Sequence, residues 1–335
     1  MDAAACGGVA GAWIRLRCHR LRQGIHVFRS SCCLLLLVVG LAMALTPLKL
    51  ARAEDSSKAL VLGRVSDDPK AQYEPTKALL DYVVARMGNV GIREGRILMA
   101  RDALQMASYL RRGRVDWVAE TAGGAMLLQR RAGAEPFLIS DRNGVRRYHT
   151  VYFARRDGDV KSIDDLRGHR IAFQNRTSTS AYFIPSMEIL DRGMPMEILG
   201  SPFDPPVSNS VGYVFARTER NIATWVHKGL VDVGAVSNLD WTNPTHVPEF
   251  FKSDFVVLRE SAEVPRGVEV VRKDLDPVVR ARLREVLLAM KDDPAAVGLL
   301  DRFHLSMRFY DLDERDRRDL KRLRKGIATI GVEIE

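Results

Sequence analysis

The chain has 335 residues, 46% of them hydrophobic, with a formal net charge of +9 at pH 7. This length and apolar content suffice for a sizeable core and predict two lobes. Most of the charge belongs to residues 1–53: the remainder carries 44 basic (51 minus 7) and 41 acidic (42 minus 1) side chains, a net +3. The basic balance therefore does not indicate nucleic-acid binding, and no nucleic-acid partner is expected.

The first 53 residues have the layout of a secretory signal peptide. An arginine-rich region precedes the 14-residue apolar run "CCLLLLVVGLAMAL", and the small-x-small sequence Ala51-Arg52-Ala53 follows. We predict a signal peptide over residues 1–53, cleavage after Ala53 and a periplasmic location. The alternative is an uncleaved anchor, but the run is shorter than the roughly 18–20 residues that a spanning helix needs. All four cysteines lie in this segment, so cleavage leaves a chain with no thiol to oxidise.

Strands and helices alternate after the leader. The pattern predicts strand 58–65, helix 73–88, strand 95–100, helix 102–113, strand 115–120 and helix 121–133. Helices of about 10–15 residues between strands indicate an α/β lobe with a largely parallel sheet.

A second group of elements follows a long strand within residues 146–158. The pattern predicts strand 169–174, helix 179–192, a Pro- and Gly-rich loop 199–213, helix 219–229, strand 230–237, strands 254–260 and 267–275, and three terminal helices. Extended segments near 150–156 and 252–258 would cross between two lobes. We therefore predict lobe 1 over 54–151, lobe 2 over 152–254, and a return to lobe 1 with C-terminal helices over 255–335. Such lobes bind a ligand between them, at the carboxyl ends of the strands.

Four consecutive hydroxyl residues follow strand 169–174: Thr177, Ser178, Thr179 and Ser180. The start of a helix has unpaired N–H groups and partial positive charge, and hydroxyls add donors that suit phosphoryl or phosphonyl oxygens. The alternative is that Ser and Thr only cap the helix and fill the turn.

The segment "STSAYFIP" resembles the hydroxyl segment of phosphate, phosphite and phosphonate ABC-transporter substrate-binding proteins. "RRGRVDWVAET", "YHTVYFARRDGDVKSIDDLRGHRIAF", "WVHKGLVDVGAVSNLDW" and "VPRGVEVVRKDLDP" resemble the family in the same order, so the likeness covers nearly all of 58–303. The resemblance implies a type II periplasmic binding fold, in which each lobe is a mostly parallel sheet flanked by helices. It also implies a partner permease in the inner membrane.

The resemblance implies a set of ligand-binding residues. The hydroxyl segment would hold the phosphorus oxygens, and the ends of other strands and the crossing segment would complete the site. The residues implied or considered are Ser178, Thr179, Ser180, Glu120, Thr121, Tyr148, His149, Thr150, Tyr182, Glu219, Ser237 and Asn238.

The sequence departs from the family pattern around this segment. Glu120-Thr121 stands where an aromatic or Gly-containing segment is common, and "RTERN" stands where a histidine is common. If Glu120 or Glu219 faces the cleft, the carboxylate needs a donor opposite it. A protonated phosphonate oxygen or the ammonium of an aminoalkylphosphonate would serve, whereas sulfate offers no proton near neutral pH. The alternative is that Glu120 caps a helix or that Glu219 pairs with a neighbouring arginine in solvent.

Other motifs do not indicate catalysis. The histidines show no short metal-ligand spacing, no Gly-x-Ser-x-Gly appears, and "AGG" at 122–124 is not followed by the Gly-Lys-Ser/Thr of a P-loop. Neither a metal nor a cofactor is therefore expected. The charged tail "DLDERDRRDLKRLRKGIATIG" predicts a solvated helix, with a partner surface as the alternative.

The predicted function is capture of a phosphonate or related phosphorus oxyanion for uptake by an ABC transporter, by a monomer that is not an enzyme. Two alternatives stay open. The protein could dock to a membrane receptor such as a histidine kinase and act in sensing, or it could be a periplasmic phosphorus-ester hydrolase.

Overall fold

The computed structural model describes residues 58–66, 68–296, 299 and 308–333. The predicted signal peptide, residues 1–53, lies outside the described residues. Within the described part, no helix combines the length and the apolar character that membrane crossing requires.

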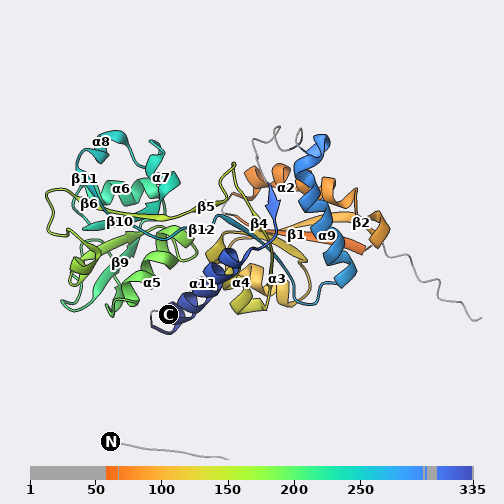
Figure 1. The fold of residues 1–335 in the computed structure, drawn as a ribbon. Coiled ribbons are helices and arrows are strands. Elements are labelled where there is room, and N and C mark those ends of the chain that lie inside the picture. Colours follow the sequence, from red (N-terminus) through yellow and green to blue (C-terminus); the bar gives the residue numbers. More distant parts are fainter. Residues whose placement is uncertain (1–57, 67, 297–298, 300–307, 334–335) are drawn as a thin grey trace, which may run out of the picture. The chain divides into compact units, whose positions relative to one another are not determined.

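Six strands form the first sheet, in the order β14-β4-β13-β3-β1-β2 (Figure 1). They are β1 (Lys58–Val65), β2 (Ile92–Ala100), β3 (Trp117–Glu120), β4 (Glu135–Ser140), β13 (Gly267–Val271) and β14 (Phe309–Tyr310). Strands β1, β2 and β3 are parallel, whereas β13 runs antiparallel to β3 and β4. The sheet is therefore mixed, because the returning chain enters it in the opposite direction.

Helices connect and flank these strands. They are α2 (Pro69–Val84), η1 (Gly88–Val90), α3 (Ala103–Arg111), α4 (Ala122–Ala132), α9 (Pro277–Ala289) and η4 (Met290–Asp292). Their starts follow local chemistry, since Asp68, Asp102 and Thr121 each accept a hydrogen bond from a first-turn N–H. Buried apolar side chains from the helices and strands form the core between them.

The second sheet also has six strands, in the order β11-β6-β10-β7-β9-β8. They are β6 (Thr150–Arg155), β7 (Arg170–Phe173), β8 (Met196–Ile198), β9 (Val211–Phe215), β10 (Val233–Ser237) and β11 (Phe255–Glu260). Strands β7 to β10 are parallel, and β6 and β11 add antiparallel pairings. Its helical segments are η2 (Ile163–Leu166), η3 (Thr179–Phe183), α5 (Ile184–Leu190), α6 (Glu219–His227), α7 (Asn238–Thr242) and α8 (Glu249–Lys252).

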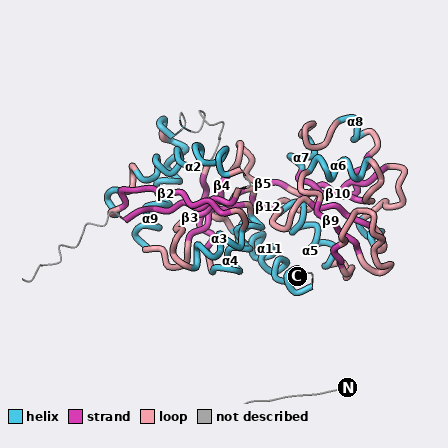
Figure 2. Tube along the Cα trace, turned by 180° about the vertical axis from the view of Figure 1, so that it is seen from behind, coloured by secondary structure: helices cyan, strands magenta, loops and turns pink. Residues whose placement is uncertain are grey.

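Two short strands lie where the chain passes between the sheets. Strand β5 (Arg147–Tyr148) pairs antiparallel with β12 (Val264–Pro265), and Figure 2 shows both strands between the two groups of longer strands. The predicted return to lobe 1 at residue 255 is wrong, because β11 pairs with β6 and stays in the second sheet. The first crossing is also earlier than predicted, since β6 begins at residue 150.

The C-terminal helix α11 (Glu314–Glu333) is not solvated on all sides, which corrects the sequence prediction. Its apolar side chains recur at helical spacing and are at most 4% exposed: Leu320, Leu323, Ile327 and Ile330. The helix packs against α4 and α5, and therefore contacts helices associated with both sheets. Most of its charged residues are exposed, whereas Asp316 is buried.

Asp316 ties the start of α11 to the first crossing strand. Its side chain is fully buried and accepts hydrogen bonds from Arg146 at 3.0 Å and from Arg147 at 2.6 Å. The Arg147 guanidinium also donates to the backbone oxygen of Glu263, which precedes β12. One buried carboxylate thus links both crossing segments to the terminal helix.

Candidate binding site

A cavity of about 700 Å³ lies where strands of both sheets end. Val65, Glu120, Phe215 and Ser237, which line it, are the last residues of β1, β3, β9 and β10. Carboxyl ends of parallel strands, where helices begin, are the usual place for ligands in α/β sheets. The remaining lining residues come from the segments that follow β1, β2, β3, β7, β9 and β10 and from the crossings: Ser66, Arg101, Asp102, Thr121, Tyr148, Gln174, Asn175, Arg176, Thr177, Ser178, Thr179, Ser180, Arg217, Glu219, Asp240 and Arg266.

The first two hydroxyls of the Thr177–Ser180 turn have local roles. The Thr177 hydroxyl donates to Asn175 Oδ1 at 2.9 Å and helps close the turn. Ser178 is the N-cap of η3, and its Oγ accepts a hydrogen bond from the Ala181 N–H at 3.2 Å. The alternative of a turn filler and a helix cap is therefore correct for Thr177 and Ser178, two of the four hydroxyl residues.

Thr179 joins the turn to the first sheet's helix α4. Its Oγ1 accepts a hydrogen bond from the Gly123 N–H at 2.8 Å, and its side chain is buried. A Cβ on Gly123 would lie 2.7 Å from that Oγ1 and 2.5 Å from the Phe183 ring. Glycine at this position therefore lets the first turn of α4 approach the hydroxyl turn closely.

Of the four hydroxyl groups in the Thr177–Ser180 turn, the one on Ser180 is available to a ligand. Its backbone oxygen accepts a hydrogen bond from Thr150 Oγ1 at 2.7 Å, which fixes the residue in place. Among the described residues, its own hydroxyl has no hydrogen-bond partner, although it lines the cavity and the residue is only 6% exposed. A fixed residue with an uncommitted donor at the start of a helix suits an anionic oxygen.

Arg266 supplies a positive charge from the second crossing. Its guanidinium lies over the Tyr148 ring, 4.7 Å from the centroid, and both residues line the cavity. Within the described part of the chain, the Arg266 side chain makes no hydrogen bond or ion pair, and its Nε is buried without a partner. An unpaired, partly buried guanidinium is well suited to bind an anion.

The charges that line the cavity are balanced in number. Four arginines face four carboxylates, which are Asp102, Glu120, Glu219 and Asp240. Glu120 is partly buried, and its Oε2 accepts a hydrogen bond from the Thr121 N–H at 3.0 Å. Burial raises the pKa of Glu120 above its usual value, although the nearby Arg142 opposes the shift.

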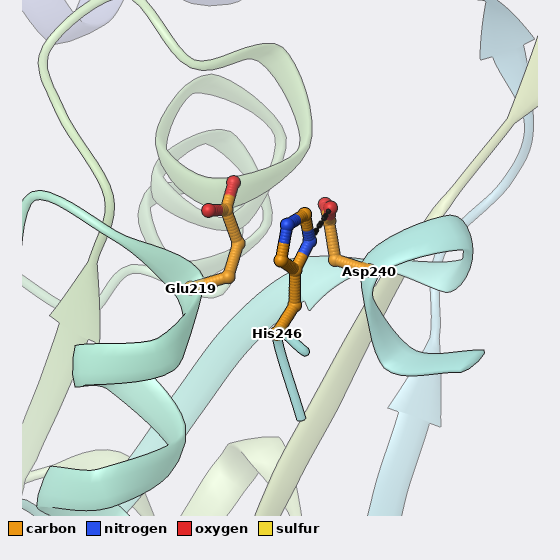
Figure 3. A group of neighbouring side chains, drawn as sticks. All are labelled: Glu219, Asp240 and His246. Carbon is orange, nitrogen blue, oxygen red and sulfur yellow. Dashed lines mark hydrogen bonds and ion pairs between the residues drawn. The ribbon is translucent and has the colours of Figure 1, made fainter. Parts of the chain in front are cut away.

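Glu219 and Asp240 lie near each other and near His246. Figure 3 shows the imidazole ring between the two carboxylates, with a hydrogen bond of 2.8 Å between His246 Nδ1 and Asp240 Oδ1. The Gln174 amide donates to Glu219 Oε1 at 2.6 Å. Burial, and next the charge of Asp240, raise the pKa of Glu219.

Comparison with known proteins identifies the family. The family model described as "ABC transporter, phosphonate, periplasmic substrate-binding protein" matches residues 64–316. The chain belongs to this family. Its members are transport substrate-binding proteins of the periplasm, and they are not enzymes.

Several solved structures are similar to this chain. The XAC2383 protein from Xanthomonas citri is 50% identical in its chloride-bound form, with a TM-score of 0.77, covering 82% of this chain and 99% of that chain. Its ATP-bound form is 49% identical, also with a TM-score of 0.77, covering 83% and 100%. PhnD1 from Prochlorococcus marinus, in complex with methylphosphonate, is 14% identical and supports the type II periplasmic binding fold alone, with a TM-score of 0.57 and coverage of 82% and 100%.

Most of the predicted ligand residues of this family member line the cavity. They are Ser178, Thr179, Ser180, Glu120, Thr121, Tyr148, Glu219 and Ser237. Their side chains therefore lie where a ligand in the cavity could contact them.

Four predicted residues do not line the cavity. Tyr182 is fully buried and packs edge-on against Phe173, so it belongs to the core. Thr150 is also fully buried and holds the Ser180 backbone. Asn238 accepts a hydrogen bond from the His149 N–H at 3.1 Å, and the His149 ring lies 3.4 Å from a Glu260 carboxylate oxygen. These residues support the turn and the first crossing.

Several lining residues were not predicted from the sequence. Arg266 lies in "VPRG", a segment that was matched to the family without a site role, and Asp240 lies three residues past a strand end. Arg217 has a left-handed backbone with φ of 71°, which is uncommon outside glycine. The neighbouring residues in the sequence do not predict this conformation. The proximity of Glu219, Asp240 and His246 was not predicted either, because Asp240 lies 21 residues after Glu219 in the sequence.

Proposed function

We propose that the protein binds an organic phosphonate or phosphate ester in the cavity and delivers it to an ABC permease. The observation that carries this proposal is the uncommitted Ser180 hydroxyl facing the same cavity as the unpaired Arg266 guanidinium. A phosphorus group accepts several hydrogen bonds, and it can take both donors at once.

The size of the cavity favours a phosphorus group that carries an organic part. A volume of about 700 Å³ is within the usual range for sites of drug-sized ligands, which is roughly 300–1,000 Å³. Phe215 adds an aromatic surface beside the hydroxyl turn, with the Arg176 guanidinium 5.2 Å from its ring centroid. The 49%-identical relative bound to ATP supports a ligand larger than methylphosphonate.

Tyr148 and Arg266 come from the two crossings, while Ser180 comes from the second lobe and Glu120 from the first. A ligand that contacts all of them would stabilise one arrangement of the lobes, and this arrangement is what a permease would recognise. Binding and release require no covalent bond to form or break.

A ligand panel tests the proposal. The purified protein is heated with phosphate, phosphite, methylphosphonate, 2-aminoethylphosphonate, adenosine monophosphate and sulfate. A ligand at a hundredfold over its Kd adds about 2.7 kcal/mol, which raises the Tm by a few degrees. We expect a shift with an organic phosphorus compound, none with sulfate, and loss of uptake of that compound in a deletion strain. No shift with any phosphorus compound would contradict binding, and unchanged uptake would contradict delivery.

A further inference from the structure

Three potential metal ligands lie close together beside the cavity, and two of them, Glu219 and Asp240, line it. Glu219 begins α6, Asp240 lies in α7, and His246 follows α7 in a loop. One ligand atom from each residue can be chosen so that all lie within 4.8 Å of one another. Figure 3 shows that the three side chains point toward a common region.

The two carboxylates lack the basic partners that acidic groups elsewhere in the chain have. Within the described residues, neither Glu219 nor Asp240 forms an ion pair with lysine or arginine, and the one ion pair of Asp240 is with His246. By contrast, Asp116 pairs with Arg272 at 2.7 Å. Two neighbouring carboxylates without a lysine or arginine ion pair concentrate negative charge at a wall facing an anion site.

Donors hold both carboxylates from outside the cluster. The Ser237 hydroxyl donates to Asp240 Oδ2 at 2.5 Å, and the Gln174 amide donates to Glu219 Oε1 at 2.6 Å. These bonds orient the carboxylates and leave Glu219 Oε2 without a hydrogen bond among the described residues. Such outer donors are typical around metal-ligating carboxylates.

We propose that Glu219, Asp240 and His246 bind one divalent transition-metal ion of the Zn²⁺ class. Two carboxylate oxygens and one imidazole nitrogen form a mixed donor set that suits Zn²⁺ better than Mg²⁺. Zinc–ligand bonds are about 2.0–2.2 Å long, so small side-chain rotations would bring the three atoms into range. The ion would replace the proton shared by His246 and Asp240.

Three protein ligands leave a coordination position open. Because Glu219 and Asp240 line the cavity, this position faces the region where the phosphorus ligand is proposed to bind. A phosphorus oxygen would occupy it, and this step alone rests on the proposed function. The ion would also neutralise the carboxylates that otherwise repel an anion.

Titration of zinc chloride into metal-free protein, without any phosphorus compound, tests the site. We expect one ion per chain by calorimetry, weaker binding of Mn²⁺, and the weakest binding of Mg²⁺. His246→Ala and Asp240→Asn should each weaken zinc binding at least tenfold. The matched control is His227→Ala, since His227 pairs with Asp254 at 2.9 Å and does not line the cavity. No zinc binding by the wild type, or equal binding by His246→Ala, would overturn the proposal.

A second titration separates this inference from the proposed function. Methylphosphonate and 2-aminoethylphosphonate are each titrated into the protein, once with zinc present and once with a chelator present, and the Kd values are compared. Zinc binding without phosphonate binding would support the metal site and contradict the proposed function. If zinc does not bind and Glu219→Gln weakens only 2-aminoethylphosphonate, the carboxylates hold an ammonium group, and the metal proposal fails.

Discussion

Replacing Arg266 by glutamine is expected to weaken binding of the phosphorus ligand roughly 10- to 100-fold. A hydrogen bond to a charged group contributes about 1.5–3 kcal/mol, and each 1.4 kcal/mol is a factor of about ten in Kd. Within the described residues, Arg266 makes no ion pair or side-chain hydrogen bond, so little of the folded structure depends on its charge. Calorimetric titration of the ligand selected by the panel measures the change.

Arg101→Gln is the matched control for this substitution. Arg101 also lines the cavity, but its side chain is 85% exposed and is paired with Asp102 at 3.1 Å. Solvent screens an exposed guanidinium, so we expect a change of threefold or less. Equal losses of affinity in the two variants would contradict a direct contact between Arg266 and the ligand. They would show that arginine charge acts only through the electrostatic potential of the cavity.

Replacing Asp316 by alanine is expected to lower the free energy of unfolding by about 3–5 kcal/mol. The carboxylate is fully buried and is the shared partner of Arg146 and Arg147. Its removal leaves the Arg147 guanidinium, whose side chain is only 12% exposed, with fewer partners to offset its desolvation. Chemical denaturation followed by circular dichroism measures the loss.

Asp164→Ala serves as the control for this measurement. Asp164 also pairs with an arginine, Arg192, at 3.1 Å, but its side chain is 79% exposed. An exposed ion pair contributes about 0–1 kcal/mol. A loss for Asp316→Ala no larger than that of Asp164→Ala would contradict the role of Asp316 as the link between α11 and the crossings.

The two-lobed α/β fold could be predicted because alternating strands and helices follow local periodicity. The strand 255–260 was recognised, but its sheet was not, since only the pairing with β6 decides where it belongs. The predicted loop 199–213 includes the first residues of β9, because the prolines and serines just before this strand are typical of loops. The terminal helix was recognised from its charged residues. Its apolar residues at helical spacing, which predict a buried face, received too little weight.

The candidate site was predictable where residues end a strand or lie in the turn and first helical residues after it. Ser178, Ser180 and Glu120 belong to this group, because carboxyl ends of parallel strands meet at one edge. Arg266 was not predicted, because long-range packing brings it to the cavity, and the same holds for the approach of His246 and Asp240 to the predicted residue Glu219. Tyr182 shows the opposite error, since its place in a helical turn directs the ring into the core.

The central claim is that the turn at residues 177–180 binds phosphorus oxygens through a hydroxyl that the fold leaves uncommitted. The most direct test compares wild type, Ser180→Ala and Ser208→Ala by calorimetric titration with the selected phosphorus ligand. Ser208 is an exposed serine outside the cavity. The account predicts that Ser180→Ala weakens binding about tenfold or more, with an unfolding temperature close to wild type, and that Ser208→Ala leaves Kd unchanged. Equal Kd values for all three proteins would contradict it.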